Sequence, residues 1–422
     1  LVIVDEASQS DLWALPAILR GKKILVVGDD KQVSPDGGFI AAQQIALLRQ
    51  RFLGDQPFAS DMTPEKSLYD LAARIFASNQ VMLREHFRCV APIIAYSNRF
   101  YGNAIRPLRI PLASERIDPP LVDIFVPAGF RDSKERNKHE AEAIADEIGA
   151  ILANPALQGR TLGVVSLLGM EQAKYIDELV RSRFPATELL RRKFTCGEPR
   201  AFQGSERDIV FLSMVADRER HHALSRMGHE QRFNVAASRA RDRMYLVRSV
   251  ELVELSDVDL RRGLIEHFSQ PAVVQGDRDD NPIHLCESGF ERDVYTRLTE
   301  RGYRVIPQVQ VGGFRIDMVV EGADDKRLAV ELDGDEFHGA DRWTHDMNRQ
   351  RILERAGWTF WRCFASTWLL HKEEVFAELL SRLHQMQIEP IGALGQLATL
   401  VEHRIWQPPS MDREADEVDR VI

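Results

Sequence analysis

The sequence predicts an α/β protein in which two regions of parallel sheet precede a smaller α+β domain. The first region is indicated by LVIVDEASQ and KKILVVGDDKQ, in which a run of apolar residues ends directly at acidic ones. Uniformly apolar runs of this kind are typical of parallel strands buried on both faces. Short apolar runs at 162–168, 208–215 and 243–249 alternate with amphipathic stretches such as 139–152. This alternation predicts a second parallel sheet covered by helices.

A third unit is predicted beyond a loose segment. The stretch VVQGDRDDNP is rich in Gly, Asp, Asn and Pro and has no apolar periodicity, which is typical of a linker. From Ser288 the pattern is helix, three strands, helix, strand and helix, with the second helix expected at 343–356. We expect the last dozen residues of the chain to be loosely ordered because they are polar and acidic. The predicted units are the end of a first sheet domain, a second sheet domain, a linker, an α+β domain and a tail, at 1–76, 77–270, 271–285, 286–386 and 387–422.

Composition restricts the class of protein. The chain has 55 Lys and Arg against 64 Asp and Glu, a net charge of -9, so any nucleic-acid surface must be local. No apolar run is long enough to cross a membrane, and no signal peptide is recognisable. The four cysteines form no C-x-x-C pair, which argues against a zinc ribbon or an iron–sulfur cluster. We therefore expect a cytoplasmic protein with no membrane partner.

Both apolar runs of the first region end at a pair of acidic residues. Ligands of open α/β sheets bind beyond the carboxyl ends of the strands, where both pairs fall. Asp5 could bind Mg²⁺ while Glu6 polarises the water that attacks a γ-phosphate. The alternative is that Asp5 caps the next helix and Glu6 is simply solvated.

Five segments resemble the motifs of superfamily 1 helicases, in the same order and spacing. They are LVIVDEASQ, GDDKQVSP, LREHFRCVAPIIAYSNRFYGN, FQGSERDIVFLS and FNVAASRARDRMYLV. The similarity is to the Upf/Dna-type subgroup and extends from residue 1 to about 250. It implies RecA-like P-loop NTPase sheets, with a partial first domain and a complete second domain.

The resemblance also implies roles for individual residues. Asp5 and Glu6 would form the Walker B motif that binds Mg²⁺ and activates water. Gln32 would sense the γ-phosphate, and Arg88 and Arg239 would reach the phosphates of ATP from the second domain. The segment from Gln203 would couple nucleotide to nucleic acid through Gly204 and Glu206.

The chemistry of these residue types agrees with the roles. The guanidinium of an arginine has a fixed charge and a planar set of donors, which suits the charge that develops on a transferring phosphoryl group. A surface salt bridge or a charge at a helix C-terminus is the alternative for Arg88 and for Arg239. Gly204 permits a close backbone approach to a phosphate or ribose, and the alternative is an ordinary turn glycine.

The sequence also departs from the family pattern. It contains no G-x-x-x-x-G-K-[ST] loop to bind the phosphates, and in the family that loop precedes the Walker B strand. The sequence starts at Leu1 inside an apolar strand, so we expect a missing N-terminal motor half. This chain alone should hydrolyse ATP poorly or not at all. His86 and Phe87 stand where the family commonly has Gln and Tyr.

A hairpin is predicted in the α+β domain, where EGADDK joins RIDMVV to RLAVELDG. Its centre falls near 324, which places Asp317 opposite Glu331, with Asp333 on the same face as Glu331. Such a cluster of carboxylates binds Mg²⁺ or Mn²⁺ and can activate water for phosphodiester cleavage. The alternative is that the carboxylates face water. However, Asp317 and Glu331 interrupt apolar runs, where an unpaired charge is costly.

The same stretch resembles the PD-(D/E)XK restriction-endonuclease-like enzymes related to the very-short-patch-repair endonuclease. The similarity rests on FERDVYTRL, GGFRIDMVV, AVELDGDEFHG and DMNRQRILERAGWTFWRCF. Asp333 stands where the motif has Lys, and His338 could act as acid or base instead, a surface His being the alternative. Glu291 could orient metal-bound water or only cap its helix. The resemblance assigns the family's acidic, His and following-helix positions to Glu291, Asp317, Glu331, Asp333, His338, Asp346 and Arg349.

Together these patterns predict part of an ATP-dependent DNA helicase fused to a metal-dependent endonuclease. Its cofactors would be ATP and Mg²⁺, with Mn²⁺ as an alternative at the nuclease site. Its substrate would be single-stranded or duplex DNA, and its role DNA repair or defence. Two alternatives stay open. The motor could act on RNA, or the nuclease-like domain could only bind DNA, which Asp333 at the Lys position favours.

Overall fold

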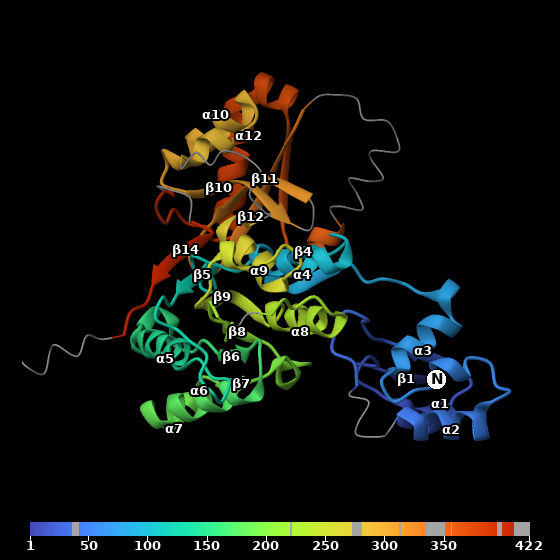
Figure 1. Cartoon of the computed structure of the whole chain (residues 1–422). Coiled ribbons are helices and arrows are strands. Elements are labelled where there is room, and N and C mark those ends of the chain that lie inside the picture. Colours follow the sequence, from blue (N-terminus) through green and yellow to red (C-terminus); the bar gives the residue numbers. More distant parts are fainter. Residues whose placement is uncertain are drawn as a thin grey trace, which may run out of the picture.

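A computed structural model describes three sheet-containing parts of the chain (Figure 1). It describes residues 1–35, 42–219, 222–271, 281–311, 314–334, 351–355, 357–394 and 399–408. The predicted fold class, parallel α/β sheets followed by an α+β domain, is confirmed. Among the helices within these ranges, none has the length and apolar character needed to span a membrane.

The N-terminal part is built on a two-stranded parallel sheet. Strand β1 (Val2–Val4) pairs with β2 (Ile24–Val26), with Val2 opposite Ile24. The helices of this part are α1 (Leu15–Ile18), α2 (Ala42–Leu53) and α3 (Leu68–Ile75). Ser67 and Asp70 form a capping box that satisfies the first backbone N–H groups of α3. Apolar side chains of both strands are exposed, including Ile3 at 60% and Leu25 at 51%.

The central part is a six-stranded sheet whose strand order is β14-β5-β9-β8-β6-β7, with every neighbouring pair parallel. Successive residues of its strands point to opposite faces of the sheet and enter two separate apolar cores, as Leu246 and Val247 do. Helices therefore cover both faces. Its strands are β5 (Leu121–Phe125), β6 (Leu162–Ser166), β7 (Thr195–Gly197), β8 (Arg207–Ser213), β9 (Ala240–Arg248) and β14 (Val401–Ile405). One core includes residues of α4 (Ala91–Asn98), α8 (Met227–Ala237) and α9 (Leu260–Ser269), and the other includes residues of α5 (Lys138–Ala153), α6 (Met170–Arg183) and α7 (Ala186–Arg191).

The edge strand β14 comes from the far end of the chain. The chain leaves the central sheet after α9, forms the α+β domain and then returns to pair with β5. Arg404 binds Glu147 through two hydrogen bonds, and the indole of Trp406 donates to Asp146 at 3.0 Å. The segment expected to be a tail therefore contains a strand of the motor sheet. The last dozen residues lie outside the described ranges.

The α+β domain contains a four-stranded sheet of order β10-β11-β12-β13. The hairpin of β11 and β12 has the predicted register, with Met318 opposite Val330 and Glu321 opposite Arg327. Residues 351–355 are helical, and the rest of the helix predicted there lies outside the described residues. The elements are α10 (Gly289–Thr299), β10 (Arg304–Val311), β11 (Phe314–Glu321), β12 (Arg327–Asp333), β13 (Phe360–Phe364) and α12 (Ala365–Gln385).

One segment of the central part packs against the α+β sheet. Strand β4 (Arg106–Arg109) pairs with β3 (Glu85–Val90) and places Leu108 in an apolar core with residues of β10, β11 and β12. Beyond it, Arg116 makes two hydrogen bonds to Glu321, whose side chain is only 6% exposed. The backbone N–H and hydroxyl of Ser114 donate to Asp325 at 2.8 and 2.6 Å. The two domains are therefore joined by apolar and ionic contacts as well as by the chain itself.

We predict that Arg116→Ala lowers the free energy of unfolding by about 2 kcal/mol, because it leaves the buried Glu321 carboxylate without its cation. The double variant Arg116→Ala plus Glu321→Ala should lose less free energy of unfolding than the sum of the losses in the two single variants. A double-mutant cycle measures this difference, with urea unfolding followed by tryptophan fluorescence. Arg181→Ala, which breaks the exposed pair with Asp177, is the control and should cost less than about 0.5 kcal/mol. If the losses of unfolding free energy in the two single variants simply add in the double variant, the prediction is contradicted.

Candidate functional site

The acidic pairs of the first domain follow β1 and β2, at the same edge of their sheet. The backbone N–H of Ala7 donates to Val27 at 2.9 Å, and that of Asp29 donates to the Ser8 hydroxyl at 2.7 Å. Asp5 accepts the backbone N–H of Glu6 at 2.9 Å. It does not cap the next helix, because Asp11 has that position and accepts the N–H of Trp13. Asp5 is thus placed at a strand end, as the sequence predicted.

Gln32 and its loop are fixed by contacts from both domains. The Gln32 amide donates to Asp29 at 3.1 Å, and the Tyr101 hydroxyl donates to the same carboxylate oxygen at 2.5 Å. Asn234 of α8 donates to the Tyr101 hydroxyl and to the Lys31 carbonyl, both at 2.8 Å. Burial, together with Asp29, raises the pKa of Tyr101, so its hydroxyl stays protonated. Sequence analysis missed Tyr101 and Asn234, although both lie inside the segments that resemble helicase motifs.

Gln32, Arg88 and Arg239 share the wall of one cleft, which has a volume of about 1640 Å³. Arg239 is 2% exposed and donates to the Val235 carbonyl at 3.0 Å. Burial and the nearby charge of Arg88 lower the pKa of Arg239 to about 10. Two guanidinium groups that repel each other inside a cleft are stabilised by an anion between them. This part of the cleft therefore has the chemistry of a phosphate site.

Four further residues assigned from the sequence, Asp5, Glu6, Gly204 and Glu206, are absent from the described wall of this cleft. A Cβ atom at Gly204 would lie 3.9 Å from a carboxylate oxygen of Glu6, and Gly204 has a φ of 72°. Glu206 accepts a hydrogen bond from Arg88 at 2.7 Å. Gly204 therefore lies beside Glu6, and Glu206 is the partner of Arg88.

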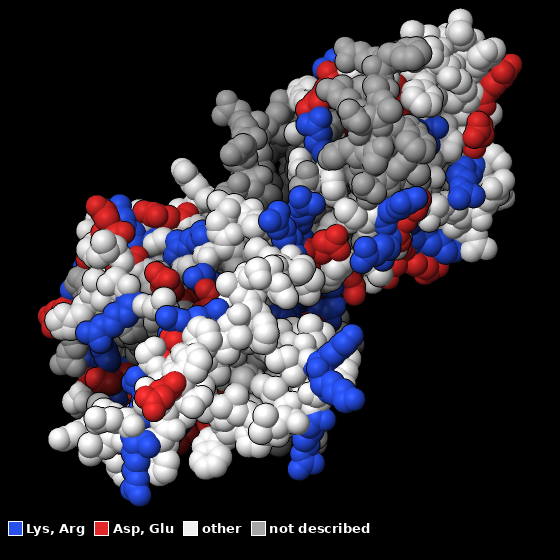
Figure 2. Space-filling view, turned by 90° about the vertical axis from the view of Figure 1, so that its right-hand side faces the viewer, with Lys and Arg blue, Asp and Glu red and all other residues white. Residues whose placement is uncertain are grey.

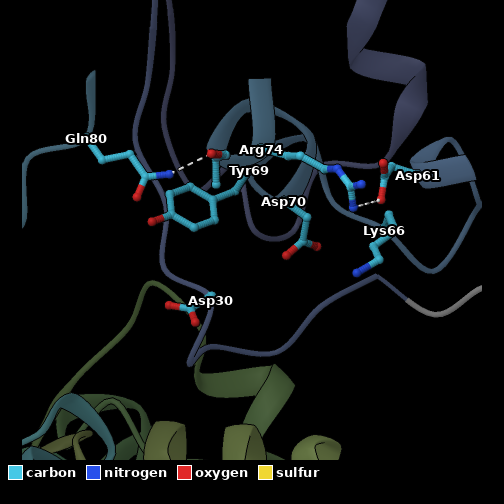
Figure 3. A pocket seen from close by; sticks show the side chains of 8 residues that line it. Asp30, Asp61, Lys66, Tyr69, Asp70, Arg74 and Gln80 are labelled. Carbon is cyan, nitrogen blue, oxygen red and sulfur yellow. Dashed lines mark hydrogen bonds and ion pairs between the residues drawn. The ribbon is translucent and has the colours of Figure 1, made fainter. Parts of the chain in front are cut away.

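A smaller polar pocket of about 320 Å³ lies beside α3 (Figure 3). Arg74 pairs with Asp61 at 3.0 Å, and Figure 3 shows Lys66 and Asp70 on the side of the loop that carries Asp30. Asp30 itself pairs with Lys31 at 3.0 Å. The two acidic residues of GDDKQ thus have different partners, since Asp29 contacts the second domain and Asp30 borders this pocket.

In the α+β domain, Asp317 and Glu331 lie opposite each other where two strands separate. The ladder between β11 and β12 stops at Met318 and Val330, one pair before these carboxylates. Beyond that point Asp317 accepts the backbone N–H of Leu332 at 2.7 Å. Glu331 is 2% exposed, and Asp317 is half-buried. Two carboxylates with only oxygen donors suit a hard cation such as Mg²⁺ or Mn²⁺.

Two other residues assigned to the nuclease site, Asp333 and Glu291, have partners of their own. Asp333 binds Arg362 at 3.1 Å, and Arg362 lies opposite Glu331 on β13. Glu291 acts in capping α10, because its carboxylate accepts the Ser288 hydroxyl and the backbone N–H of Glu287. The described ranges contain no group of three His, Cys, Asp or Glu residues arranged to hold a metal. His338, Asp346 and Arg349 lie outside the described residues.

Charges are mixed over the face of the molecule in Figure 2, where Lys and Arg alternate with Asp and Glu. Among the residues coloured in Figure 2, this face carries no broad basic area. The distribution agrees with the expectation from net charge that any nucleic-acid surface is local.

The six-stranded parallel sheet is that of a RecA-like domain, and the C-terminal α+β unit is restriction-endonuclease-like. Comparison with known families agrees. Residues 65–251 match the AAA domain family AAA_12, and residues 290–383 match the restriction-endonuclease (REase) family REase_MTES_1575. The chain therefore carries a superfamily 1 helicase-type AAA domain followed by a restriction-endonuclease-like domain, and both resemblances expected from the sequence are confirmed.

Individual relatives carry helicase names. The chain is 28% identical to an uncharacterized ATP-dependent helicase, the MG140 homolog of Mycoplasma pneumoniae, over 92% of this chain and 37% of that protein. It is 25% identical to the 5'-3' DNA helicase ZGRF1 of Mus musculus, over 59% of this chain and 13% of that protein. The chain thus spans a minor part of these relatives. The C-terminal domain of a possible DNA helicase from Lactobacillus plantarum WCFS1 aligns with 42% of this chain and 92% of that chain, at 16% identity and a TM-score of 0.27.

His86 makes stability depend on pH. Its ring nitrogen Nε2 accepts the backbone N–H of Cys89 at 3.0 Å, and burial together with Arg88 lowers its pKa from 6.5 to about 4. The unfolded chain therefore binds this proton more readily than the folded chain. We predict that the contribution of His86 to stability is present above pH 6.5 and is lost as the pH falls toward 4.

The measurement is the melting temperature at pH 7 and pH 5. His86→Gln retains an acceptor for the N–H of Cys89 and cannot titrate, so its melting temperature should fall less between the two pH values. His371→Gln removes an exposed histidine and is the matched control. An identical fall in the unmodified chain and in His86→Gln would contradict the assignment.

Proposed function

We propose that this chain is part of an ATP-dependent superfamily 1 DNA helicase that also carries a metal-dependent endonuclease domain. The observation that carries the motor proposal is the meeting of Gln32, from one domain, with Arg88 and Arg239, from the other, on one cleft wall. The mutual repulsion of the two arginines supports an anionic ligand there. Gly204, which lacks a Cβ beside Glu6, supports close approach of a ligand to that carboxylate.

Within this proposal each residue has a defined task. Asp5 holds the Mg²⁺ that accompanies ATP, and Glu6 orients and polarises the attacking water. Arg88 and Arg239 neutralise charge that develops on the phosphoryl group. Gln32 contacts the γ-phosphate, while Asp29 and Tyr101 hold its loop against the second domain. Gly204 and Glu206 couple the bound nucleotide to nucleic acid.

The two-stranded sheet supports a further partner, the remaining half of the first motor domain. Ile3 and Leu25 expose more than half of their surface although they belong to strands whose sequence is uniformly apolar. Strands of this type are normally covered on both faces. We infer that these side chains pack against upstream motor residues, which would also supply the phosphate-binding loop that this sequence lacks.

The motor proposal predicts nucleic-acid-stimulated ATP hydrolysis by a longer protein that includes the phosphate-binding loop. Arg239→Ala in that protein should lower kcat by about 100-fold or more, because it removes a charge that acts on the transition state. The exposed Arg191→Ala is the control. ATPase activity stimulated by RNA and not by single-stranded DNA would favour the RNA helicase alternative, and unchanged kcat in Arg239→Ala would contradict the role of this arginine.

The endonuclease proposal rests on Asp317 and Glu331 at the opening between two strands. They would hold Mg²⁺ or Mn²⁺, which when bound supplies an activated water and stabilises charge on the phosphodiester. Arg362, next to Glu331 on β13, is positioned to neutralise a phosphate, and Asp333 fixes its guanidinium. A role in DNA repair or in defence against foreign DNA belongs to this proposal by analogy only.

The rival function is a domain that binds DNA without cutting it. The ion pair between Asp333 and Arg362 favours this rival function, because no lysine occupies position 333 and Asp333 already has a partner. The two functions differ in one observable, the appearance of metal-dependent cleavage products.

We predict that this chain nicks or cuts supercoiled DNA in Mg²⁺ or Mn²⁺ and that Asp317→Asn combined with Glu331→Gln abolishes the products. These changes keep the shape of both side chains and an acceptor for the N–H of Leu332, so the fold should persist. Glu300→Gln combined with Glu378→Gln removes two exposed carboxylates as the control. Equal cleavage by both variants would exclude the assigned site, and DNA binding without products would support the rival.

A further inference from the structure

Gln308 lies in the middle of β10 with an unusual backbone conformation. Its φ is 54°, in the left-handed region that residues other than glycine seldom adopt. The strand turns over at this residue. Val305 packs in the core beneath α10 and α12, whereas Val309 packs against the opposite core, although alternate residues of a regular strand share a face. The partner strand turns over at the same level, between Ile316 and Met318.

The side chain of Gln308 is held in one orientation. Its amide nitrogen donates to Glu291 at 2.7 Å, and a carboxylate in that place repels the amide oxygen. The oxygen must therefore point away from Glu291. It is buried and has no hydrogen-bond partner among the described residues. A buried carbonyl oxygen without a donor is destabilising, and so is a left-handed backbone at a residue other than glycine, so Gln308 combines two unfavourable features.

The strand register places this residue beside the candidate metal site. Pro307 lies opposite Met318 and Val309 opposite Ile316, so Gln308 lies opposite Asp317. Continuing the hairpin ladder places Asp317 opposite Glu331. Gln308, Asp317 and Glu331 therefore lie in one row across three neighbouring strands, which contains one neutral amide and two carboxylates. Directly opposite residues of antiparallel strands have Cβ atoms about 5 Å apart, so Asp317 is the neighbour of Gln308 in this row.

We propose that Gln308 is a positioning residue of this metal site. Its oxygen accepts a hydrogen bond from a water of the hydrated Mg²⁺ or Mn²⁺ that Asp317 and Glu331 hold, while its nitrogen is fixed by Glu291. The cation's water supplies the donor that the buried oxygen lacks. Glu291 thus acts on the site through Gln308 and not as a metal ligand. This inference rests on the proposed endonuclease function.

The test is the affinity of the unmodified chain and its variants for Mn²⁺ by titration calorimetry, with the urea midpoint as a second readout. Gln308→Asn shortens the side chain by one methylene, and Gln308→Met removes both polar atoms. Each should weaken Mn²⁺ binding by about tenfold or more, the usual effect of removing a partner of metal-bound groups. Gln308→Asn should keep the urea midpoint, because Asn tolerates a positive φ. Gln310→Asn, at an exposed position of the same strand, is the matched control.

The outcomes separate this inference from the proposed function. A merely structural role predicts a lower urea midpoint and unchanged Mn²⁺ affinity, and that result would overturn the assignment of Gln308 while the metal site stands. If the unmodified chain binds Mn²⁺ no better than the Asp317→Asn and Glu331→Gln double variant, both proposals fail. In a chain that already carries Gln308→Met, Glu291→Gln should change Mn²⁺ affinity little, because Glu291 acts through the amide of Gln308. If Glu291→Gln lowers Mn²⁺ affinity as much in that chain as in the unmodified chain, Glu291 acts on the site independently of Gln308.

Discussion

Pairing of backbone groups between neighbouring strands is the constraint on which the arrangement of both candidate sites depends. Inside a sheet the backbone N–H and carbonyl groups are used by the neighbouring strands, and the side chains of buried strands are apolar. Polar chemistry is then confined to strand ends and to places where the ladder is interrupted. Asp5 and Asp29 follow two parallel strands at one edge. Asp317 and Glu331 lie one pair beyond the point where an antiparallel ladder stops, and Gln308 lies where a strand turns over.

The contacts between domains follow from the same constraint. Tyr101 and Asn234 come from the second motor domain and fix the loop that carries Gln32, so the loop conformation depends on how the two domains meet. At the other end of the central domain, β4 adds Leu108 to the core of the nuclease-like sheet. Its partner β3 carries Arg88. A single two-stranded ribbon therefore connects the cleft wall that carries Arg88 with the apolar core of the nuclease-like sheet.

Electrostatics distinguishes the two sites. The cleft brings two arginines together, and burial together with the charge of Arg88 lowers the pKa of Arg239, so an anion between them would be stabilising. The nuclease-like sheet brings two carboxylates together, a pair that a divalent cation stabilises. Neither arrangement needs a large net charge, which agrees with the mixed surface of Figure 2.

The sequence by itself determined the fold class, the order of the parts and the register of the hairpin. These follow from short-range patterns: apolar runs ending at Asp5 and Asp29, and a turn at EGADDK that fixes which residues of β11 and β12 are opposite. It also identified Gln32, Arg88 and Arg239 through their motifs. Their roles, and those of the carboxylates, stay predictions.

Only the tertiary structure decided the pairings between distant segments. VEHRI near residue 401 is too short and too polar to be recognised as a strand of the motor sheet, because an edge strand needs only one partner. Arg362 of β13, the partner of Asp333, also comes from a distant segment of the chain. Tyr101 and Gln308 carried no distinctive local pattern. Their importance lies in contacts with Asp29 and Glu291, which chain folding brings close and which no spacing along the sequence reveals.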